Sequence, residues 1–386
     1  MTRRWIRATQ ALLLVAFLTP VAAMADRKLD DAIAVARKTE IVFEDLAHRV
    51  MPAVVTITRY VNDEAWWKAA NEGKSLSGGW QNFSFDDLAY SGKRPTGGGS
   101  GFLITDEGYI LTLRRVVVEP ATGEPADTLD VQVGTERYGA TVAGMEPALD
   151  LAILKIVPRV PTMPFLKLGD SGKARVGNWV VAFGDPSGNE KTMVPGIVSY
   201  EPSRQCYQDE LSATYLQTSM RVGDGALGGP VVNLKGEVVG ITTRRSDSAR
   251  PESLVGEASC GYVLPINLAT AIYHSLILRS DYTSPWLGIS VLVLTDDQRK
   301  QTGVANATGI YIDNVFDPSP ATQAGIKVGD ILTLMDKQPI ADVYGFQSKL
   351  YELGVGTTVK LGLLRGKRRM EVTTVIAARP VEATTR

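Results

Sequence analysis

The chain has 386 residues, of which 44% are hydrophobic and 22% are charged, a composition typical of a globular protein with a substantial core. Its formal net charge of −1 excludes a strong overall electrostatic attraction to nucleic acid or to an anionic membrane. Its two cysteines and two histidines show no metal-ligand spacing, so neither a metal site nor a cofactor is expected.

The N-terminus has the composition of a secretory signal peptide over residues 1–25. Arginines precede the apolar run 11–17, and Ala23-Met24-Ala25 supplies small residues before a cleavage position at Asp26. An uncleaved anchor is the alternative, although Pro20 and the short apolar run fall below the ~20 residues that span a bilayer. We therefore expect an exported, periplasmic protein without a stable membrane span.

Two cysteines, Cys206 and Cys260, remain in the predicted exported chain. An oxidising compartment favours a disulfide between them, and two free thiols are the alternative. In the chain-entropy description such a bridge contributes about 4 kcal/mol to stability.

The predicted secondary structure changes in kind along the chain. Residues 26–50 carry an approximately helical apolar stripe and are predicted as an N-terminal helical segment. From there to residue 281, short β-branched runs alternate with turn residues, which predicts an all-β barrel or sandwich domain over 51–281. The predicted strands are residues 53–57, 101–104, 109–112, 129–133, 151–156, 179–183, 196–199 and 238–241.

Residues 61–98 interrupt the strand pattern with Gly, Ser, Asn and aromatic residues, which predicts a long loop. Its aromatic side chains suit a contact between subunits, and folding back onto the same barrel is the alternative. A helix at about 267–278 closes the region. A compact α+β module then follows over 283–382, with strands alternating with helical segments near 321–324 and 344–353.

Several motifs, in this order, resemble the HtrA (DegP-like) family of exported serine proteases. In the barrel region they are Gly99-Ser100-Gly101, Gly108-Tyr109-Ile110, Asp150-Leu151-Ala152 and Gly228-Gly229-Pro230, and in the second module the run Pro320 to Ile331. The resemblance covers about residues 45–380. It implies a mainly β fold, in which a chymotrypsin-like double β-barrel is followed by an α+β PDZ domain.

The resemblance also implies a degenerate catalytic triad. Arg115 stands where the family has its general-base histidine, Leu227 stands where it has the nucleophilic serine, and only Asp150 matches. Leucine has no nucleophilic atom, and arginine stays protonated and accepts no proton. The two histidines, His48 and His274, lie in predicted helices away from these motifs. We therefore expect no catalytic residues. We expect Arg115 to pair with Asp150, because desolvating either charge alone is unfavourable, and a turn of Arg115 to solvent is the alternative.

The second implied site is a peptide-binding site in the PDZ domain. Trp286-Leu287-Gly288-Ile289 is similar to the family's carboxylate-binding loop. A peptide C-terminus held there would add as a strand beside a helix that carries Phe346 and Leu350. A PDZ fold that serves only for packing is the alternative.

The expected function is that of a pseudoprotease that binds protein or peptide C-termini as a chaperone-like, scaffolding or regulatory factor of the cell envelope. Two alternatives stay open, namely a regulatory subunit that assembles with an active relative, as a homo- or hetero-oligomer, and a working protease with a non-standard mechanism. In the family's barrel, the segments of Cys206 and Cys260 both border the active-site position, which suits a bridge between them.

Overall fold

The computed structural model describes residues 33–34, 36–65, 68, 92–185, 190–203, 215–243, 261–278, 282–301 and 307–380. The predicted signal peptide, both cysteines and most of the predicted loop 61–98 lie outside these ranges. The chain divides into two compact units, Met1–Arg49 and Val50–Arg386. In the first unit, residues 36–49 are helical, which confirms the predicted helix for that stretch. No helix in the described ranges is long and apolar enough to cross a membrane.

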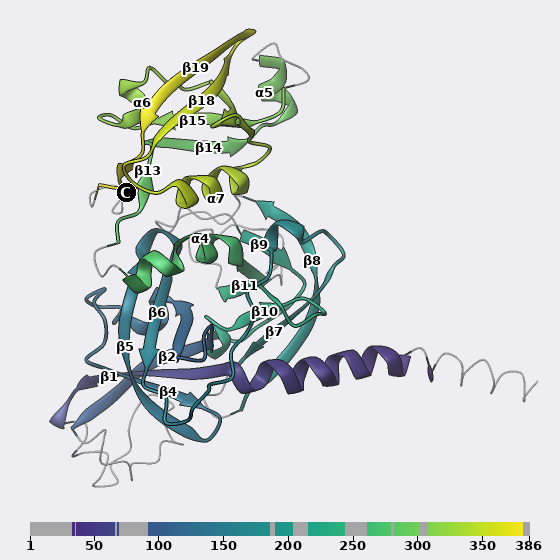
Figure 1. Cartoon of the computed structure of the whole chain (residues 1–386), viewed down its shortest axis with the longest axis vertical. Helices are drawn as coiled ribbons and strands as arrows, with labels where there is room; N and C mark the ends of the chain where they lie inside the picture. Colours follow the sequence, from purple (N-terminus) through teal and green to yellow (C-terminus); the bar gives the residue numbers. More distant parts are fainter. Residues whose placement is uncertain are drawn as a thin grey trace, which may run out of the picture. The chain divides into compact units, whose positions relative to one another are not determined.

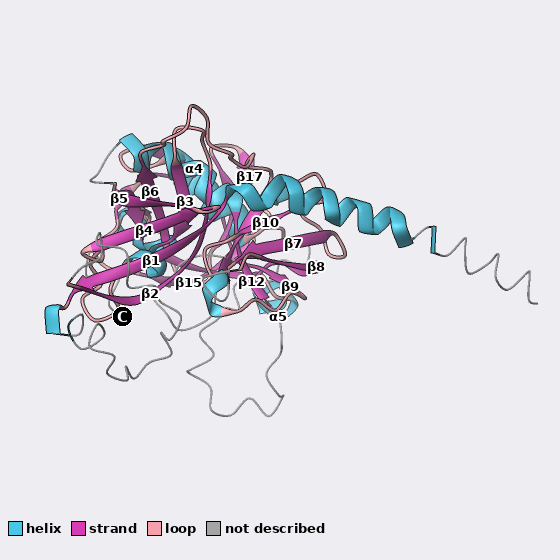
Figure 2. Cartoon of the chain, turned by 90° about the horizontal axis from the view of Figure 1, so that it is seen from below, coloured by secondary structure: helices cyan, strands magenta, loops and turns pink. Residues whose placement is uncertain are grey.

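The second unit begins with two closed barrels of antiparallel strands (Figures 1 and 2). The first barrel has the strand order β1-β2-β3-β6-β5-β4 and is followed by the second, with the order β10-β11-β12-β9-β8-β7. The first consists of β1 (Val54–Asn62), β2 (Lys93–Leu103), β3 (Tyr109–Leu113), β4 (Thr128–Val133), β5 (Glu136–Glu146) and β6 (Leu151–Ile156). The second consists of β7 (Trp179–Gly184), β8 (Thr192–Ser203), β9 (Tyr215–Thr218), β10 (Pro230–Val232), β11 (Val238–Thr243) and β12 (Gly261–Pro265), and α4 (Ile266–Leu278) follows it.

Alternating apolar side chains fill the first barrel, where Phe102, Ile110 and Ile153 are fully buried. The predicted loop 61–98 is wrong at both ends, because 61–62 belong to β1 and 93–98 belong to β2. The glycines in this stretch allow a close approach of two strands rather than a loop. A Cβ on Gly98 would lie 2.0 Å from the carbonyl oxygen of Ile57 on β1.

The PDZ-type domain is a sheet in the order β14-β15-β16-β18-β19, so β14 and β19 are its edge strands. Its apolar core includes Leu287, Val291, Phe346 and Leu350. The elements are β13 (Pro285–Trp286), β14 (Ile289–Val293), α5 (Asp296–Gln301), β15 (Ile310–Val315), α6 (Pro320–Gln323), β16 (Ile331–Met335), β17 (Gln338–Pro339), α7 (Val343–Leu353), β18 (Thr358–Arg365), β19 (Arg368–Val375) and β20 (Ala377–Ala378). The predicted mainly β fold, a double barrel followed by a PDZ domain, is confirmed.

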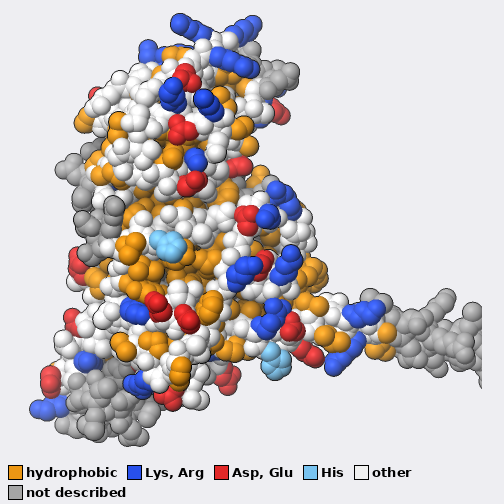
Figure 3. Space-filling view, in the orientation of Figure 1, with side chains coloured by type: hydrophobic (Ala, Val, Ile, Leu, Met, Phe, Trp, Pro, Cys, Tyr) orange, Lys and Arg blue, Asp and Glu red, His pale blue; other side chains and the backbone are white. Residues whose placement is uncertain are grey.

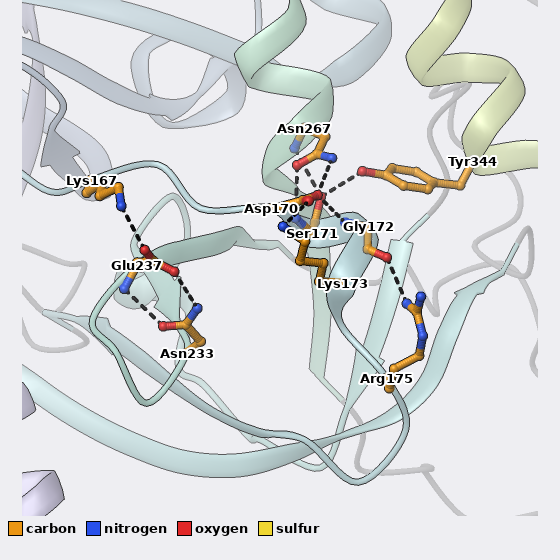
Figure 4. A network of polar contacts seen from close by, with 10 residues as sticks. All are labelled: Lys167, Asp170, Ser171, Gly172, Lys173, Arg175, Asn233, Glu237, Asn267 and Tyr344. Atoms are coloured by element: carbon orange, nitrogen blue, oxygen red, sulfur yellow. Dashed lines mark hydrogen bonds and ion pairs between the residues drawn. The ribbon is translucent and has the colours of Figure 1, made fainter.

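A partly buried polar network joins the second barrel to the PDZ domain (Figure 4). The hydroxyl of Ser171, in the 3-10 turn Ser171–Lys173, lies 2.7 Å from the hydroxyl of Tyr344 on α7. The same Ser171 oxygen accepts the backbone N–H of Asn267 at 3.1 Å, and the Asn267 amide donates to Asp170 at 2.9 Å. One serine therefore connects the start of α4 to the start of α7.

A double-mutant cycle tests this contact between Ser171 and Tyr344. Because the paired hydroxyls are buried, we expect Ser171→Ala and Tyr344→Phe to be coupled by about 1 kcal/mol in the free energy of unfolding, measured by urea denaturation. Ser171→Ala with Tyr311→Phe is the matched control and should show no coupling. A coupling near zero for the first pair would mean that the contact between Ser171 and Tyr344 does not stabilise the protein.

Candidate functional site

The position of the general base is held by the short helix α3 (Arg114–Val117), which follows β3 directly. The backbone N–H of Arg115 donates to Oδ1 of Asp150 at 2.9 Å, and its side-chain Nε donates to Oδ2 of the same carboxylate. The predicted pairing of Arg115 with Asp150 is therefore confirmed, and the alternative in which Arg115 turns to solvent is wrong. The Arg115 side chain remains 34% exposed, whereas that of Asp150 is 7% exposed.

Asp150 is placed by a 3-10 turn, Pro147–Leu149, and takes a left-handed conformation with φ of 55°. Its carbonyl oxygen accepts the N–H of Arg114 at 2.7 Å. The backbone and the side chain of Asp150 therefore both accept N–H groups of the first turn of α3, which have no partner within the helix. Burial raises the pKa of Asp150, and the charge and hydrogen bonds of Arg115 oppose that rise. The arginine thus compensates a carboxylate that the barrel keeps out of water.

A second arginine, Arg59 of β1, supports the other end of α3. Its Nη1 donates to the carbonyl oxygens of Arg115 and Val116 at 2.9 and 3.3 Å. Burial lowers the pKa of Arg59, and Glu119, 3.4 Å away, opposes that shift. Sequence reasoning missed this residue. The available signal was the glycine run after residue 96, because a Cβ on Gly97 would lie 2.5 Å from the Arg59 guanidinium.

The nucleophile position is Leu227, which follows the 3-10 turn Asp224–Ala226. The backbone N–H of Leu227 donates to Asp224 O at 3.1 Å, and that of Ala226 donates to Gly223 O at 2.9 Å. The carbonyl oxygen of Leu227 accepts the N–H of Ser100 at 2.8 Å. The N–H of Leu227 is therefore used inside the loop, at a position where an active protease would need a donor for an oxyanion.

The glycines of this loop are explained by packing. Gly228 has φ of +86°, and a Cβ there would lie 2.3 Å from Ser100 O and 2.4 Å from Thr112 Oγ1. A Cβ on Gly99 would contact both Leu227 O and the Val116 side chain, at 2.7 and 2.8 Å. The positions of Arg115 and Leu227 are thus brought together across β2, as the resemblance implies.

His274 lies on α4 (Ile266–Leu278), which follows the second barrel. It is exposed on α4, where its ring lies 3.9 Å from that of Tyr273. His48 belongs to the helix of the first unit. Across the described ranges, no group of three or more His, Cys, Asp or Glu side chains is placed to hold a metal ion.

The loop Trp286-Leu287-Gly288-Ile289 connects β13 to β14. The carbonyl oxygen of Leu287 accepts Ala321 N–H at 3.0 Å, and that of Gly288 accepts Phe316 N–H at 2.9 Å. Gly288 has φ of +79°, and a Cβ there would lie 2.1 Å from Cβ of Ser319. Two successive carbonyls of the loop are therefore turned toward the segment 316–321.

The structure brings the predicted peptide-site residues into one region. Phe346 and Leu350 lie on α7 and are 4% and 8% exposed, in the same core as Leu287 and Val291 of β14. Their side chains are therefore largely buried in the apolar core of the domain. Beside them, β14 pairs with β15 on one side only, which leaves its other edge without a strand partner among the described residues.

Comparisons with known proteins agree with this architecture. A trypsin-like peptidase domain matches residues 99–241, and a PDZ domain matches residues 285–376. The serine protease HhoA of Synechocystis sp. is 32% identical over 296 residues, which cover 73% of this chain and 71% of that protein. A periplasmic serine endoprotease of the DegP-like type from Brucella suis is 32% identical over 75% of this chain, which spans 54% of that relative. The solved HtrA-type protease AlgW with a decapeptide has a TM-score of 0.62 and 25% identity, covering 88% of this chain and 99% of that one.

Proposed function

Since the chain belongs to the HtrA (DegP-like) family of serine proteases, we propose that it is a pseudoprotease of that family, which binds protein or peptide C-termini through its PDZ domain. The observation that carries the first part is the Arg115–Asp150 pair beside Leu227. An arginine engaged with the buried carboxylate accepts no proton, and a leucine supplies no nucleophile. Although relatives of this chain are named as proteases, two of the three triad roles lack their side chains here.

The second part of the proposal concerns the PDZ domain. With the carbonyls of Leu287 and Gly288 engaged by the segment 316–321, the N–H groups of the loop are the natural donors for a terminal carboxylate. A peptide would then pair along the edge of β14 that has no strand partner in the described ranges, beside α7. The HtrA-type protease AlgW, solved with a decapeptide, supports peptide binding by a protein of this architecture.

A chain that holds C-termini without cleaving them acts as a chaperone-like, scaffolding or regulatory factor. The DegP-like relatives are described as periplasmic, which supports the cell envelope as the place of action. The alternative role, as a regulatory subunit of an active relative, would use the same PDZ site. It differs from the chaperone-like role only in the partner that the site binds.

Peptide binding is tested by fluorescence polarisation of labelled C-terminal peptides against the full chain. We expect dissociation constants near 1 µM for peptides with a free carboxylate and an apolar last residue, because one short strand buries little surface. Amidation of the same peptides should weaken binding at least about tenfold, because a charge-assisted acceptor is lost. Equal affinity for acid and amide would contradict carboxylate recognition, and no binding of either would make the domain a packing element.

A further inference from the structure

The hairpin of β18 and β19 ends in a group of cations. Arg365 closes β18, Arg368 opens β19, and Gly366 and Lys367 form the turn between them, with φ of +55° at the glycine. Lys367, Arg368 and Arg369 are all exposed. Figure 3 shows Lys and Arg side chains gathered at this end of the PDZ domain.

The hairpin is fixed to a neighbouring turn that carries another cation. The Arg365 guanidinium holds both oxygens of buried Asp330 at 2.7 Å and donates to Gly325 O at 2.7 Å. Between those two residues lie Lys327, which is exposed, and Val328, which is 57% exposed. We call Lys327, Lys367, Arg368 and Arg369 the basic tip.

The acidic side chains at this end are already engaged. Asp330 pairs with Arg365, and Glu371 of β19 lies 3.7 Å from Lys360. The helix α5 lies near this end, because Leu294 and Ala307 on either side of it share a small apolar cluster with Leu364. On α5, Asp296 pairs with Arg299 and Asp297 pairs with Lys300. No acidic side chain in the described part of the chain pairs with the basic tip. Its four positive charges are therefore locally uncompensated, although the net charge of the chain is only −1.

Protection of an edge strand is the simplest explanation for such charges, because cations on an edge discourage pairing with other chains. It accounts for Arg368 and Arg369, which lie on the edge strand β19. It does not account for Lys367, which lies in the turn, or for Lys327, which lies in a different loop. Glutamates at the same positions would protect the edge equally well. Reversing the charges therefore distinguishes edge protection from a role that requires positive charge.

We propose that the basic tip docks the protein on an anionic phospholipid surface. A projecting hairpin end presents no concavity for a folded partner, whereas mobile phosphate headgroups can gather around separate cations. The exposed Val328 beside Lys327 adds an apolar side chain able to enter the headgroup region. Each cation near an anionic bilayer contributes about fivefold in affinity, and the attraction decays within a Debye length.

The test is co-sedimentation of the full chain with vesicles of phosphatidylglycerol or of phosphatidylcholine, at low and high salt. Replacing three cations in Lys367→Glu/Arg368→Glu/Arg369→Glu should weaken binding to phosphatidylglycerol at least about 100-fold, at about fivefold for each charge. The matched control is Arg159→Glu/Lys167→Glu/Lys173→Glu, which removes three barrel cations with 65%, 77% and 83% exposed side chains. It should stay within about threefold of the unmodified chain. The apolar N-terminal segment is present in every variant, so the difference reports the tip.

The proposal predicts that binding to phosphatidylglycerol falls steeply with salt, that binding to phosphatidylcholine does not depend on the tip, and that peptide affinity is unchanged in the tip variant. Unaltered co-sedimentation of the tip variant would overturn it and leave edge protection as the role of these charges. It would be overturned equally if the unmodified chain ignored phosphatidylglycerol or bound acidic proteins in its place. Because peptide binding uses β14 and not β19, its failure and the failure of membrane docking are separable.

Discussion

Arg115→Met is expected to lower the free energy of unfolding by about 2 kcal/mol at pH 7, because it leaves the buried carboxylate of Asp150 without its cation. Breaking a fully buried ion pair typically costs 3–5 kcal/mol, and the partial exposure of Arg115 reduces the effect through solvent screening. The double variant Arg115→Met/Asp150→Asn removes both charges and should recover much of the loss. Urea denaturation of the three proteins measures the difference.

The sign of the pH dependence follows from the same pair. Burial already raises the pKa of Asp150, and without Arg115 the pKa in the folded state rises further. The folded variant then keeps a proton that the unfolded chain releases near pH 4, so its stability is lost as pH rises above that value. We therefore expect the deficit of Arg115→Met to be smaller at pH 4 than at pH 7.

Arg94→Met supplies the matched control. Arg94 Nε lies 3.0 Å from Oδ2 of Asp63, but these side chains are 39% and 32% exposed. Its loss should therefore cost less than about 1 kcal/mol and show little dependence on pH. If Arg115→Met were as mild as this control, or equally destabilising at pH 4 and pH 7, Asp150 would not depend on the arginine.

Much of the fold could be predicted from the sequence, because local patterns carry it. Short apolar runs bounded by turn residues, such as 151–156, became barrel strands, and the segments predicted as helices at 267–278 and 344–353 became α4 and α7. The resemblance to the HtrA (DegP-like) family, carried by the order of the motifs, implies that Arg115, Asp150 and Leu227 lie in one region. The pairing of Arg115 with Asp150 then followed from charge and burial.

The rest depends on contacts between distant residues that leave no local pattern. Arg59 reaches the carbonyl of Arg115 across 56 positions, and Ser171 meets Tyr344 across 173. The glycine run before Ser100 has the composition of a loop but lies in a strand, because composition alone does not distinguish a turn from two backbones in close approach. The 3-10 turn that uses the N–H of Leu227 is a backbone conformation, which the residue types do not specify.

The turn Asp224–Ala226 is the basis of the largest expected effect. We expect that neither Leu227→Ser nor Leu227→Ser/Arg115→His restores proteolysis. Leu227→Ser alone lacks a base, because Arg115 stays protonated. In Leu227→Ser/Arg115→His the new imidazole would meet Asp150, which already faces position 115. With the N–H of residue 227 still donating to Asp224 O, however, the oxyanion lacks a donor, and one missing donor costs about 10²–10³ in kcat.

We therefore expect the unmodified chain and Leu227→Ser to show no turnover of fluorescent casein, and the double variant to remain at least about 100-fold below an active family member assayed in parallel. A fluorophosphonate probe is the control, since it reports whether the introduced serine has become nucleophilic apart from any cleavage. Full activity of the double variant would mean that the 224–226 turn rearranges once a serine is present. Turnover by the unmodified chain that survives repurification and disappears on mutation of another residue would mean that a different mechanism operates, because neither Leu227 nor Arg115 can supply the chemistry.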